Sequence, residues 1–396
     1  MMLVEAFRRA SGQLVPITGT SARLGAWAHV AFVPDPLPHR TPVGLTVATW
    51  RSVADARAAL AALDATSQFL PNPGLLRQPA LRREAQSTSA LEGTFAPLVD
   101  VLGADDEDDP RADGALREVV NYIRTAAHAF DWAAEGRPLT LGLLDDLQRR
   151  LVSGTSSDGV RAGRIRDIQV AIGATPTGHP RDARFVPPPP GPALEASARD
   201  LLGWMRDGSE ALDPLVAAAL AHYQFETLHP YTDGNGRIGR LLIVLQLLQR
   251  GVLQEPTLTV SPWFEARRGE YYDRLFAVST DGDWDGWIHF FGEGLLASAV
   301  DTRERMLALV AARRAMTGSV RAAGLRADNA NRAVDFALAQ PVFAVRQLQR
   351  HLGVTYARAN GLVAQLVRAG VLTTYDERSY DRRFVAPQVL EVLLRE

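Results

Sequence analysis

The sequence predicts a mainly α-helical protein with few β-strands. Alanine- and leucine-rich segments with the period of a helix recur along the chain, as in residues 53–63. Helix boundaries carry the expected signals, such as Asp213 followed by Pro214, which predict an N-cap and a first helical position. Apolar residues alternate with polar or small ones in residues 165–172, which is the pattern of a strand. We therefore expect a helical framework with a short β segment at this place.

The predicted helices follow one another along most of the chain. They are expected at 53–63, 75–90, 116–134, 140–152, 194–205, 213–227, 241–248, 262–278, 284–297 and 301–326. Residues 1–50 are rich in proline and glycine and are expected to be extended chain packed on the rest. The acidic run 105–110 is expected to be a solvated loop rather than a metal site.

Length and composition restrict the class of protein. The 396 residues are enough for two or three domains, and a net charge of −2 gives no general attraction to nucleic acid or anionic membranes. The chain has no run of about 18 apolar residues and no secretory signal, so we expect a cytoplasmic protein without a membrane partner. It has no cysteine and no lysine, which excludes thiolate and Schiff-base chemistry and a Walker-type phosphate loop.

Residues 229–240, which read HPYTDGNGRIGR, combine several groups suited to phosphate chemistry. The residue before a proline is pushed out of helical geometry, so Pro230 should end the preceding helix and place His229 in a loop. A histidine has an unperturbed pKa of about 6.5 and can take a proton from a hydroxyl near neutral pH. Asp233 lies where a carboxylate would hold a Mg²⁺ ion that bridges phosphates.

The same stretch offers an anion-binding helix start. The residues Gly234, Asn235 and Gly236 open the next helix, whose N-terminal N–H groups and dipole attract anions, and glycine lets a phosphate approach the backbone. Arg237 and Arg240 lie three residues apart on one helix face and can bind further phosphate oxygens. A purely structural loop would rarely satisfy so many positions together, so we interpret this stretch as a nucleotide site.

Residues 229–240 resemble the signature of the Fic family: histidine, proline, aromatic, any residue, acidic, glycine, asparagine, glycine, arginine, any two residues, arginine. The resemblance implies a helical Fic core that transfers AMP from ATP, with Mg²⁺, to a hydroxyl of a target protein. By position, His229 would deprotonate that hydroxyl, Asp233 would hold Mg²⁺, and the turn 234–236 would line the anion cradle. Arg237 would contact phosphates, and Arg240 would contact the γ-phosphate.

The resemblance covers roughly residues 30–300 and implies a short β-hairpin flap next to the site. Residues 163–166, the strand 170–172 and residues 185–188 together resemble this flap, which in Fic enzymes pairs with a segment of the target protein by strand addition. In this chain Ile165, Arg166 and Ile168 would dock the target.

Residues 88–93 match the family's inhibitory pattern, with Thr88, Glu92 and Gly93 at the specified positions in a helix that precedes the core. The resemblance implies that Glu92 pairs with Arg240 and blocks productive binding of the ATP γ-phosphate. A carboxylate on that guanidinium would compete directly with an anionic phosphate. The alternative is an ordinary ion pair at a helix end, where Gly93 is also expected to act as the cap.

Residues 331–396 resemble a winged helix-turn-helix, with Gly353 at the turn and residues 376–384 as the wing. In a DNA-binding protein of this kind the second helix enters the major groove and basic wing residues bind phosphates. Acidic residues dilute the charge of this wing. Binding of nucleic acid through 341–387 is therefore less favoured than packing or contact with a partner, including a second copy of the chain.

These patterns predict four regions: 1–100 with the inhibitory helix, 101–300 as the catalytic core, 301–330 as a helical linker and 331–396 as the winged helix-turn-helix. The predicted function is an autoinhibited protein adenylyltransferase that modifies a serine, threonine or tyrosine hydroxyl and releases pyrophosphate. Two alternatives stay open. The same site could remove AMP from a modified target, with Glu92 orienting a water molecule, or the chain could be a DNA-binding regulator.

Overall fold

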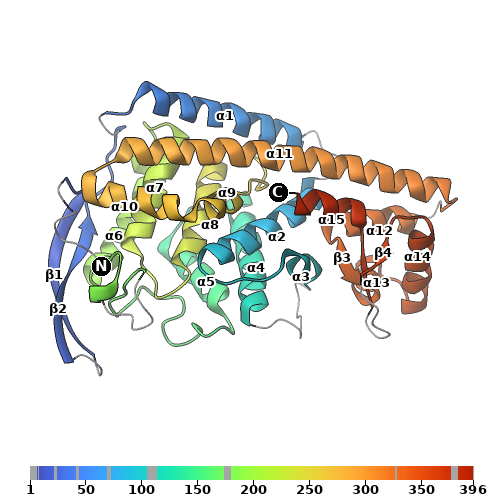
Figure 1. Ribbon diagram of the computed structural model, residues 1–396, viewed down its shortest axis with the longest axis horizontal. Helices are drawn as coiled ribbons and strands as arrows, with labels where there is room; N and C mark the ends of the chain where they lie inside the picture. The colour runs from blue at the N-terminus through green and yellow to red at the C-terminus, as the bar shows by residue number, and fades with distance from the viewer. Residues whose placement is uncertain are drawn as a thin grey trace. The chain divides into compact units, whose positions relative to one another are not determined.

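The computed structural model confirms a mainly helical chain with two small antiparallel sheets (Figure 1). It describes residues 7, 9–21, 25–41, 44–68, 73–104, 114–173, 180–325, 328–375 and 382–395. The acidic run at 105–110 lies outside the described residues. None of the helices in the described part of the chain is long and apolar enough to cross a membrane.

The elements have the following bounds. The helices are α1 (Val47–Gln68), α2 (Pro73–Leu91), α3 (Leu98–Gly103), α4 (Gly114–Ala134), α5 (Leu141–Val152), α6 (Pro192–Gly203), α7 (Pro214–Leu228), α8 (Asn235–Gln249), α9 (Ser261–Ala266), α10 (Arg268–Asp281), α11 (Trp284–Ala322), α12 (Asp328–Ala339), α13 (Val345–Leu352), α14 (Tyr356–Arg368) and α15 (Pro387–Leu394). The strands are β1 (Gly12–Ser21), β2 (Gly25–Pro34), β3 (Val342–Ala344), β4 (Thr373–Thr374) and β5 (Arg383–Val385).

The chain divides into two compact units. The first contains Met1–Ala61, Arg124–Gln254 and Trp263–Ala297, and the second contains Ala62–Ile123, Glu255–Pro262 and Ser298–Glu396. Helices α1, α4 and α11 contribute residues to both units. The two helices predicted at 284–297 and 301–326 are joined in the single helix α11, which ends at Ala322. The division into four regions stays a prediction.

Helices α7 and α8 pack against each other in the first unit and are buried on nearly all sides. A helix that is apolar all round must be surrounded by protein, and α7 is of this kind. Its start is the one predicted: the Asp213 side chain accepts a hydrogen bond from the N–H of Leu215 at 2.8 Å, and Pro214 occupies the first turn. The loop between these two buried helices carries the predicted site.

The N-terminal region, predicted as extended chain packed on the rest, forms regular strands. Strands β1 and β2 form an antiparallel hairpin that pairs Gly12 with Pro34 at one end and Ser21 with Gly25 at the other. Pro16 lies inside β1, and a proline weakens a strand pattern because it cannot donate a ladder hydrogen bond. It is tolerated here because β1 pairs with β2 alone and is therefore an edge strand.

The strand predicted at residues 165–172 is not formed, although its end contacts residue 185 of the predicted flap. Its pairing there is reduced to one isolated bridge between Ile172 and Phe185. The prolines at 187–190 have no N–H to donate to a ladder. A side chain makes the contact instead: Nε2 of Gln169 donates to the Pro187 carbonyl at 2.9 Å. The two parts of the predicted flap therefore contact each other through one bridge and a side chain, without a regular ladder in the described residues.

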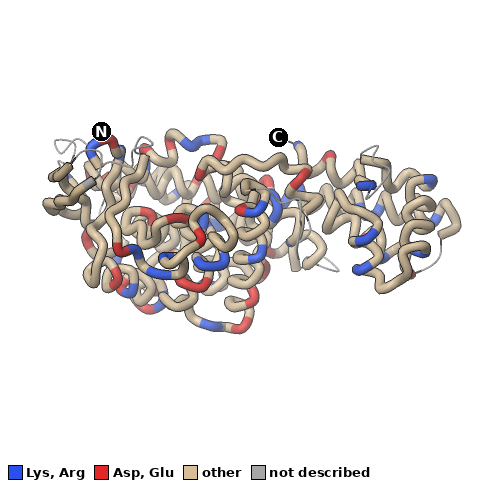
Figure 2. The backbone as a smooth tube through the Cα atoms, turned by 90° about the horizontal axis from the view of Figure 1, so that it is seen from below, with Lys and Arg blue, Asp and Glu red and all other residues tan. Residues whose placement is uncertain are grey.

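In the second unit, the C-terminal residues form the sheet β3-β5-β4 with helices α13 and α14. Gly353 has φ +66° and forms the predicted turn between these two helices. Both helices carry arginines and no acidic residue. Figure 2 marks the basic residues along the backbone in blue and the acidic ones in red. Most of the predicted wing lies outside the described residues, so the winged-helix assignment stays a prediction.

Candidate active site in the loop between helices α7 and α8

His229 leaves helix α7 in a left-handed conformation, with φ 48° and ψ 60°. Among the described residues it is the only non-glycine residue with a positive φ. Its N–H still donates to the Phe225 carbonyl at 3.0 Å, so the histidine directly terminates the helix. A left-handed residue with a Cβ costs about 1–2 kcal/mol and persists only where surrounding contacts impose it. Such strain favours a functional role for His229.

Arg166 supplies the contacts that impose this conformation. Its Nε donates to the His229 carbonyl at 2.8 Å, its Nη1 to the Ile168 carbonyl at 3.1 Å and its Nη2 to the Pro188 carbonyl. Its backbone N–H donates to the Pro230 carbonyl at 2.9 Å. Burial lowers the pKa of Arg166 to about 10, so the guanidinium still carries its charge at neutral pH. Arg166 is therefore a positioning residue for the loop.

The predicted docking role does not fit Arg166, because its side chain is only 1% exposed. Ile165 is half-buried, whereas Ile168 is 41% exposed and available to a partner. The docking role of the two isoleucines stays a prediction.

Asn235 closes the loop from its other end. Its Oδ1 accepts the N–H of Tyr231 at 2.9 Å, and its Nδ2 donates to the Tyr231 carbonyl at 2.8 Å. Its side-chain amide is thus committed to the loop. The backbone N–H of Asn235 is the group that can bind a phosphate. The first N–H bonded within the helix is that of Ile238, which donates to the Gly234 carbonyl at 3.0 Å, so the N–H groups before it have no partner in the helix.

Gly234 must be glycine for two reasons. It is the N-cap of α8 with φ +81°, a conformation that residues with a Cβ rarely adopt. A Cβ at this position would also lie 2.7 Å from Cδ2 of Leu151. Glycine is therefore required at the start of α8, where the Leu151 side chain packs directly against the backbone.

Asp233 is held toward the start of α8 through one of its oxygens. Oδ1 accepts the N–H of Gly234 at 2.6 Å and Nη2 of Arg237 at 3.2 Å, while no described residue donates to Oδ2. The side chain is 38% exposed. The described residues contain no cluster of three or more histidine, cysteine, aspartate or glutamate side chains. This donor set fits Mg²⁺, which is commonly bound by one carboxylate together with substrate phosphates.

Arg237 and Arg240 are both buried in α8, with exposures of 2% and 1%. Burial and, second, the charge of Arg240 lower the pKa of His222 to about 3. His222 is therefore neutral, and its ring nitrogens bond to the Gly239 carbonyl at 3.1 Å and to the Tyr271 hydroxyl at 2.8 Å. His222 is a packed core residue.

Two residues of α5 support the loop and were missed from the sequence. The Tyr231 hydroxyl donates to Oδ1 of Asp145 at 3.0 Å, and Nε2 of Gln148 donates to the Asp233 carbonyl at 3.2 Å. Burial, followed by the charge of Asp145, raises the pKa of Tyr231, which keeps the hydroxyl proton in place as the donor. The tyrosine at position 231, where the signature more often has phenylalanine, was the one available signal for a polar partner.

The predicted inhibitory residue lies at the end of α2. The N–H groups of Gly93 and Thr94 bond to the carbonyls of Ala90 and Ser89 at 3.0 Å each, which closes the helix with Gly93 at φ +92°. The predicted cap is confirmed. Glu92 is exposed and belongs to the second unit, whereas Arg240 belongs to the first, so their pairing stays a prediction.

Comparison with known proteins gives consistent results. Residues 50–131 match the model of the Fic/DOC family N-terminal domain, and residues 138–247 match that of the Fic/DOC family. The protein adenylyltransferase fic-1 of Caenorhabditis briggsae is 39% identical over 154 residues, which are 39% of this chain and 26% of that protein. The protein adenylyltransferase Fic of Culex quinquefasciatus is 30% identical over 210 residues, 53% of this chain and 36% of that protein.

The chain thus spans only about a quarter to a third of the length of these curated relatives. Among solved structures, a Fic family protein from Desulfovibrio desulfuricans G20 aligns over 88% of this chain and 98% of its own, with a TM-score of 0.54 and 22% identity. This likeness concerns the fold.

Replacing Arg166 by methionine tests its role in holding the loop. The substitution removes the donor of three carbonyls, of which the Pro188 carbonyl accepts in a buried contact, and one unsatisfied buried group costs about 1–3 kcal/mol. We expect the free energy of unfolding to fall by at least this amount, measured by urea denaturation with tryptophan fluorescence. Arg164→Met is the matched control, because Arg164 is exposed. Equal midpoints for the two variants would contradict the role.

Proposed function

Because residues 50–131 and 138–247 belong to the Fic/DOC family, we propose that this chain is a protein adenylyltransferase that transfers AMP from ATP to a hydroxyl of a target protein. The similar proteins that are named protein adenylyltransferases support this activity. The single observation that carries the proposal is the placement of His229 directly before a helix start that is built to bind an anion.

In this proposal His229 takes the proton of the target hydroxyl. The hydroxyl oxygen then bonds to the α-phosphorus of ATP, the bond from that phosphorus to the β-phosphate oxygen breaks, and pyrophosphate leaves. A histidine that acts as a general base contributes typically about 10²–10⁴ in rate. The contact from Arg166 to the His229 carbonyl, at 2.8 Å, fixes the backbone from which the imidazole projects.

The start of α8 would bind the phosphates. Its first N–H groups and positive dipole end face an anion, and the buried guanidinium groups of Arg237 and Arg240 add positive charge along the same helix. Arg240 is the proposed partner of the γ-phosphate. When Mg²⁺ is bound, it neutralises phosphate charge, and Asp233 would hold it.

The proposal includes inhibition by Glu92. Thr88, Glu92 and Gly93 complete the sequence pattern, α2 lies within the matched N-terminal domain, and Glu92 is exposed directly after a closed helix end. A carboxylate there can pair with a guanidinium, and Arg240 would then be contested between Glu92 and the γ-phosphate.

His229→Ala should abolish the labelling of the protein by ATP that carries ³²P at its α-phosphate, because the substitution removes the proposed acceptor of the hydroxyl proton. A loss of about 10²-fold or more is expected from the removal of a general base. His128→Ala serves as control, since His128 lies on α4 with 35% side-chain exposure. Full labelling by His229→Ala would overturn the proposed mechanism.

Glu92→Gly should raise self-labelling from the same ATP, by about fivefold or more, the lower end of a typical coupling between sites. Glu92→Gln, which keeps the shape and removes the charge, should give an intermediate increase. Unchanged labelling in Glu92→Gly, combined with its loss in His229→Ala, would mean that Glu92 does not inhibit. Removal of AMP from pre-labelled protein, dependent on Glu92, would instead support the reverse reaction.

A further inference from the structure

Helix α2 carries the proposed inhibitory motif at its C-terminal end and contains a proline within the helix, Pro79. A proline inside a helix has no N–H to donate to the carbonyl four residues earlier, and its ring crowds that carbonyl. The helix is therefore weak at this turn. Contacts from other elements of the second unit must keep α2 continuous across Pro79.

Ion pairs link α2 to α11 one turn after this proline. Nη1 of Arg83 donates to Oδ2 of Asp301 at 2.8 Å, and Nε of Arg305 donates to the same oxygen at 2.9 Å. Burial favours a higher pKa for Asp301, but the hydrogen bond from Arg305 and the charge of Arg83 outweigh it, so the pKa is lowered. Asp301 therefore stays ionised and holds the two guanidinium groups together.

Arg305 also binds the C-terminal end of α15. Its Nη1 donates to the Val392 carbonyl at 2.8 Å, and its Nη2 donates to the Arg395 carbonyl at 2.6 Å. The last carbonyls of a helix have no hydrogen-bond donor within it and carry partial negative charge. A guanidinium supplies both the donors and a positive charge. A single side chain of α11 thus connects α15, through Asp301, with Arg83 of α2.

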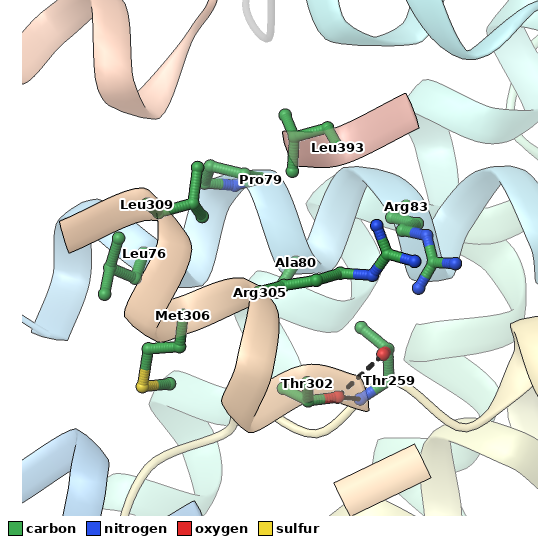
Figure 3. A pocket seen from close by; sticks show the side chains of 10 residues that line it. All are labelled: Leu76, Pro79, Ala80, Arg83, Thr259, Thr302, Arg305, Met306, Leu309 and Leu393. Carbon is green, nitrogen blue, oxygen red and sulfur yellow. Dashed lines mark hydrogen bonds between the residues drawn. The ribbon is translucent and has the colours of Figure 1, made fainter. Parts of the chain in front are cut away.

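The three helices meet around a small cavity beside Pro79 (Figure 3). Apolar side chains line it from α2 (Leu76, Pro79), α11 (Met306, Leu309) and α15 (Leu393). Its volume of about 20 Å³ is room for roughly one water molecule, so the surrounding side chains are nearly close-packed. The C-terminal helix therefore packs against α2 at its weakest turn.

The C-terminal residues reach α2 by two further routes. Helix α12 packs along α2. Arg82 of α2 donates to the carbonyls of Val101 and Ala104 at 2.6 and 3.3 Å, and the Ala104 carbonyl also accepts Nε2 of Gln340 at 3.3 Å. Helix α2 is thus held by the C-terminal region on several sides.

We propose that the C-terminal region, residues 328–395, is a regulatory element that holds α2 in its inhibitory position through Arg305 and α15. A partner that binds this region and displaces α15 would loosen α2 at Pro79 and move Glu92 away. The proposed regulation rests on the autoinhibition by Glu92 proposed above. The mechanical link between α15 and α2 is independent of that autoinhibition.

Arg305→Ala in the full chain tests the regulation. It removes the donors to Val392 and Arg395 and one of the two guanidinium groups on Asp301. Self-labelling by α-labelled ATP should rise by about fivefold or more and should rise no further when Glu92→Gly is added. Arg314→Ala, an equal loss of charge at an exposed position of the same helix, should label as the parent does.

Hydrogen exchange tests the mechanical link without any enzymatic activity. Amides of residues 73–91 should exchange faster in Arg305→Ala than in the parent and in Arg314→Ala, with circular dichroism showing that the chain is folded. Leu393→Ala should have the same effect through loss of packing. Arg305→Lys should have a smaller effect, because the ammonium keeps the charge but cannot make all the hydrogen bonds of the guanidinium.

Two results would overturn the proposal. Unchanged exchange in 73–91 would show that α15 does not hold α2, whatever the activity. An equal gain in labelling from Arg305→Ala with and without Glu92→Gly would show an effect that bypasses Glu92. If no variant is labelled, Glu92→Gly included, the proposed function fails, and the exchange data still decide the link between α15 and α2.

Discussion

The buried guanidinium of Arg166 is the contact on which the candidate site depends. A charge that is almost fully removed from water is costly, and here no carboxylate neutralises it within the loop; backbone carbonyls take all its described hydrogen bonds. That cost is offset only if the carbonyls stay where they are. The same contacts therefore fix the His229 backbone in its left-handed conformation and connect it, through Arg166, with Ile168 and Pro188.

The loop is constrained from three directions, and the constraints share few atoms. Arg166 binds the His229 end, Asn235 binds both backbone groups of Tyr231, and Gln148 of α5 binds the Asp233 carbonyl. The histidine, the carboxylate and the helix start are thereby held as one body. A proton acceptor and a phosphate site in fixed relative positions reduce the entropy that a transfer reaction has to lose on reaching its transition state.

Features that depend on a few neighbouring residues were predictable from the sequence. The N-cap Asp213 and the turn at Gly353 follow from local backbone rules, and the structure has both. The hairpin β1–β2 was missed because its edge position, which makes Pro16 acceptable, depends on tertiary pairing. Arg166 was misassigned for the same reason. An arginine in an alternating segment cannot be told from a surface residue until its distant partners are known, above all the His229 carbonyl, 63 residues away.

The two residues of the proposed switch are held very differently. Arg240 is buried in α8, inside a pair of helices that are covered on nearly all sides, so moving it would disrupt the core of its unit. Glu92 is exposed, follows the last turn of α2, and depends on a helix that is weakened by Pro79. Residues 81–91 of α2 are nearly all buried, so the free energy needed to release Glu92 is set by the contacts that hold this helix. Relief of inhibition should therefore proceed by displacement of α2 rather than of α8, and an activating signal has to reach the elements that pack against α2.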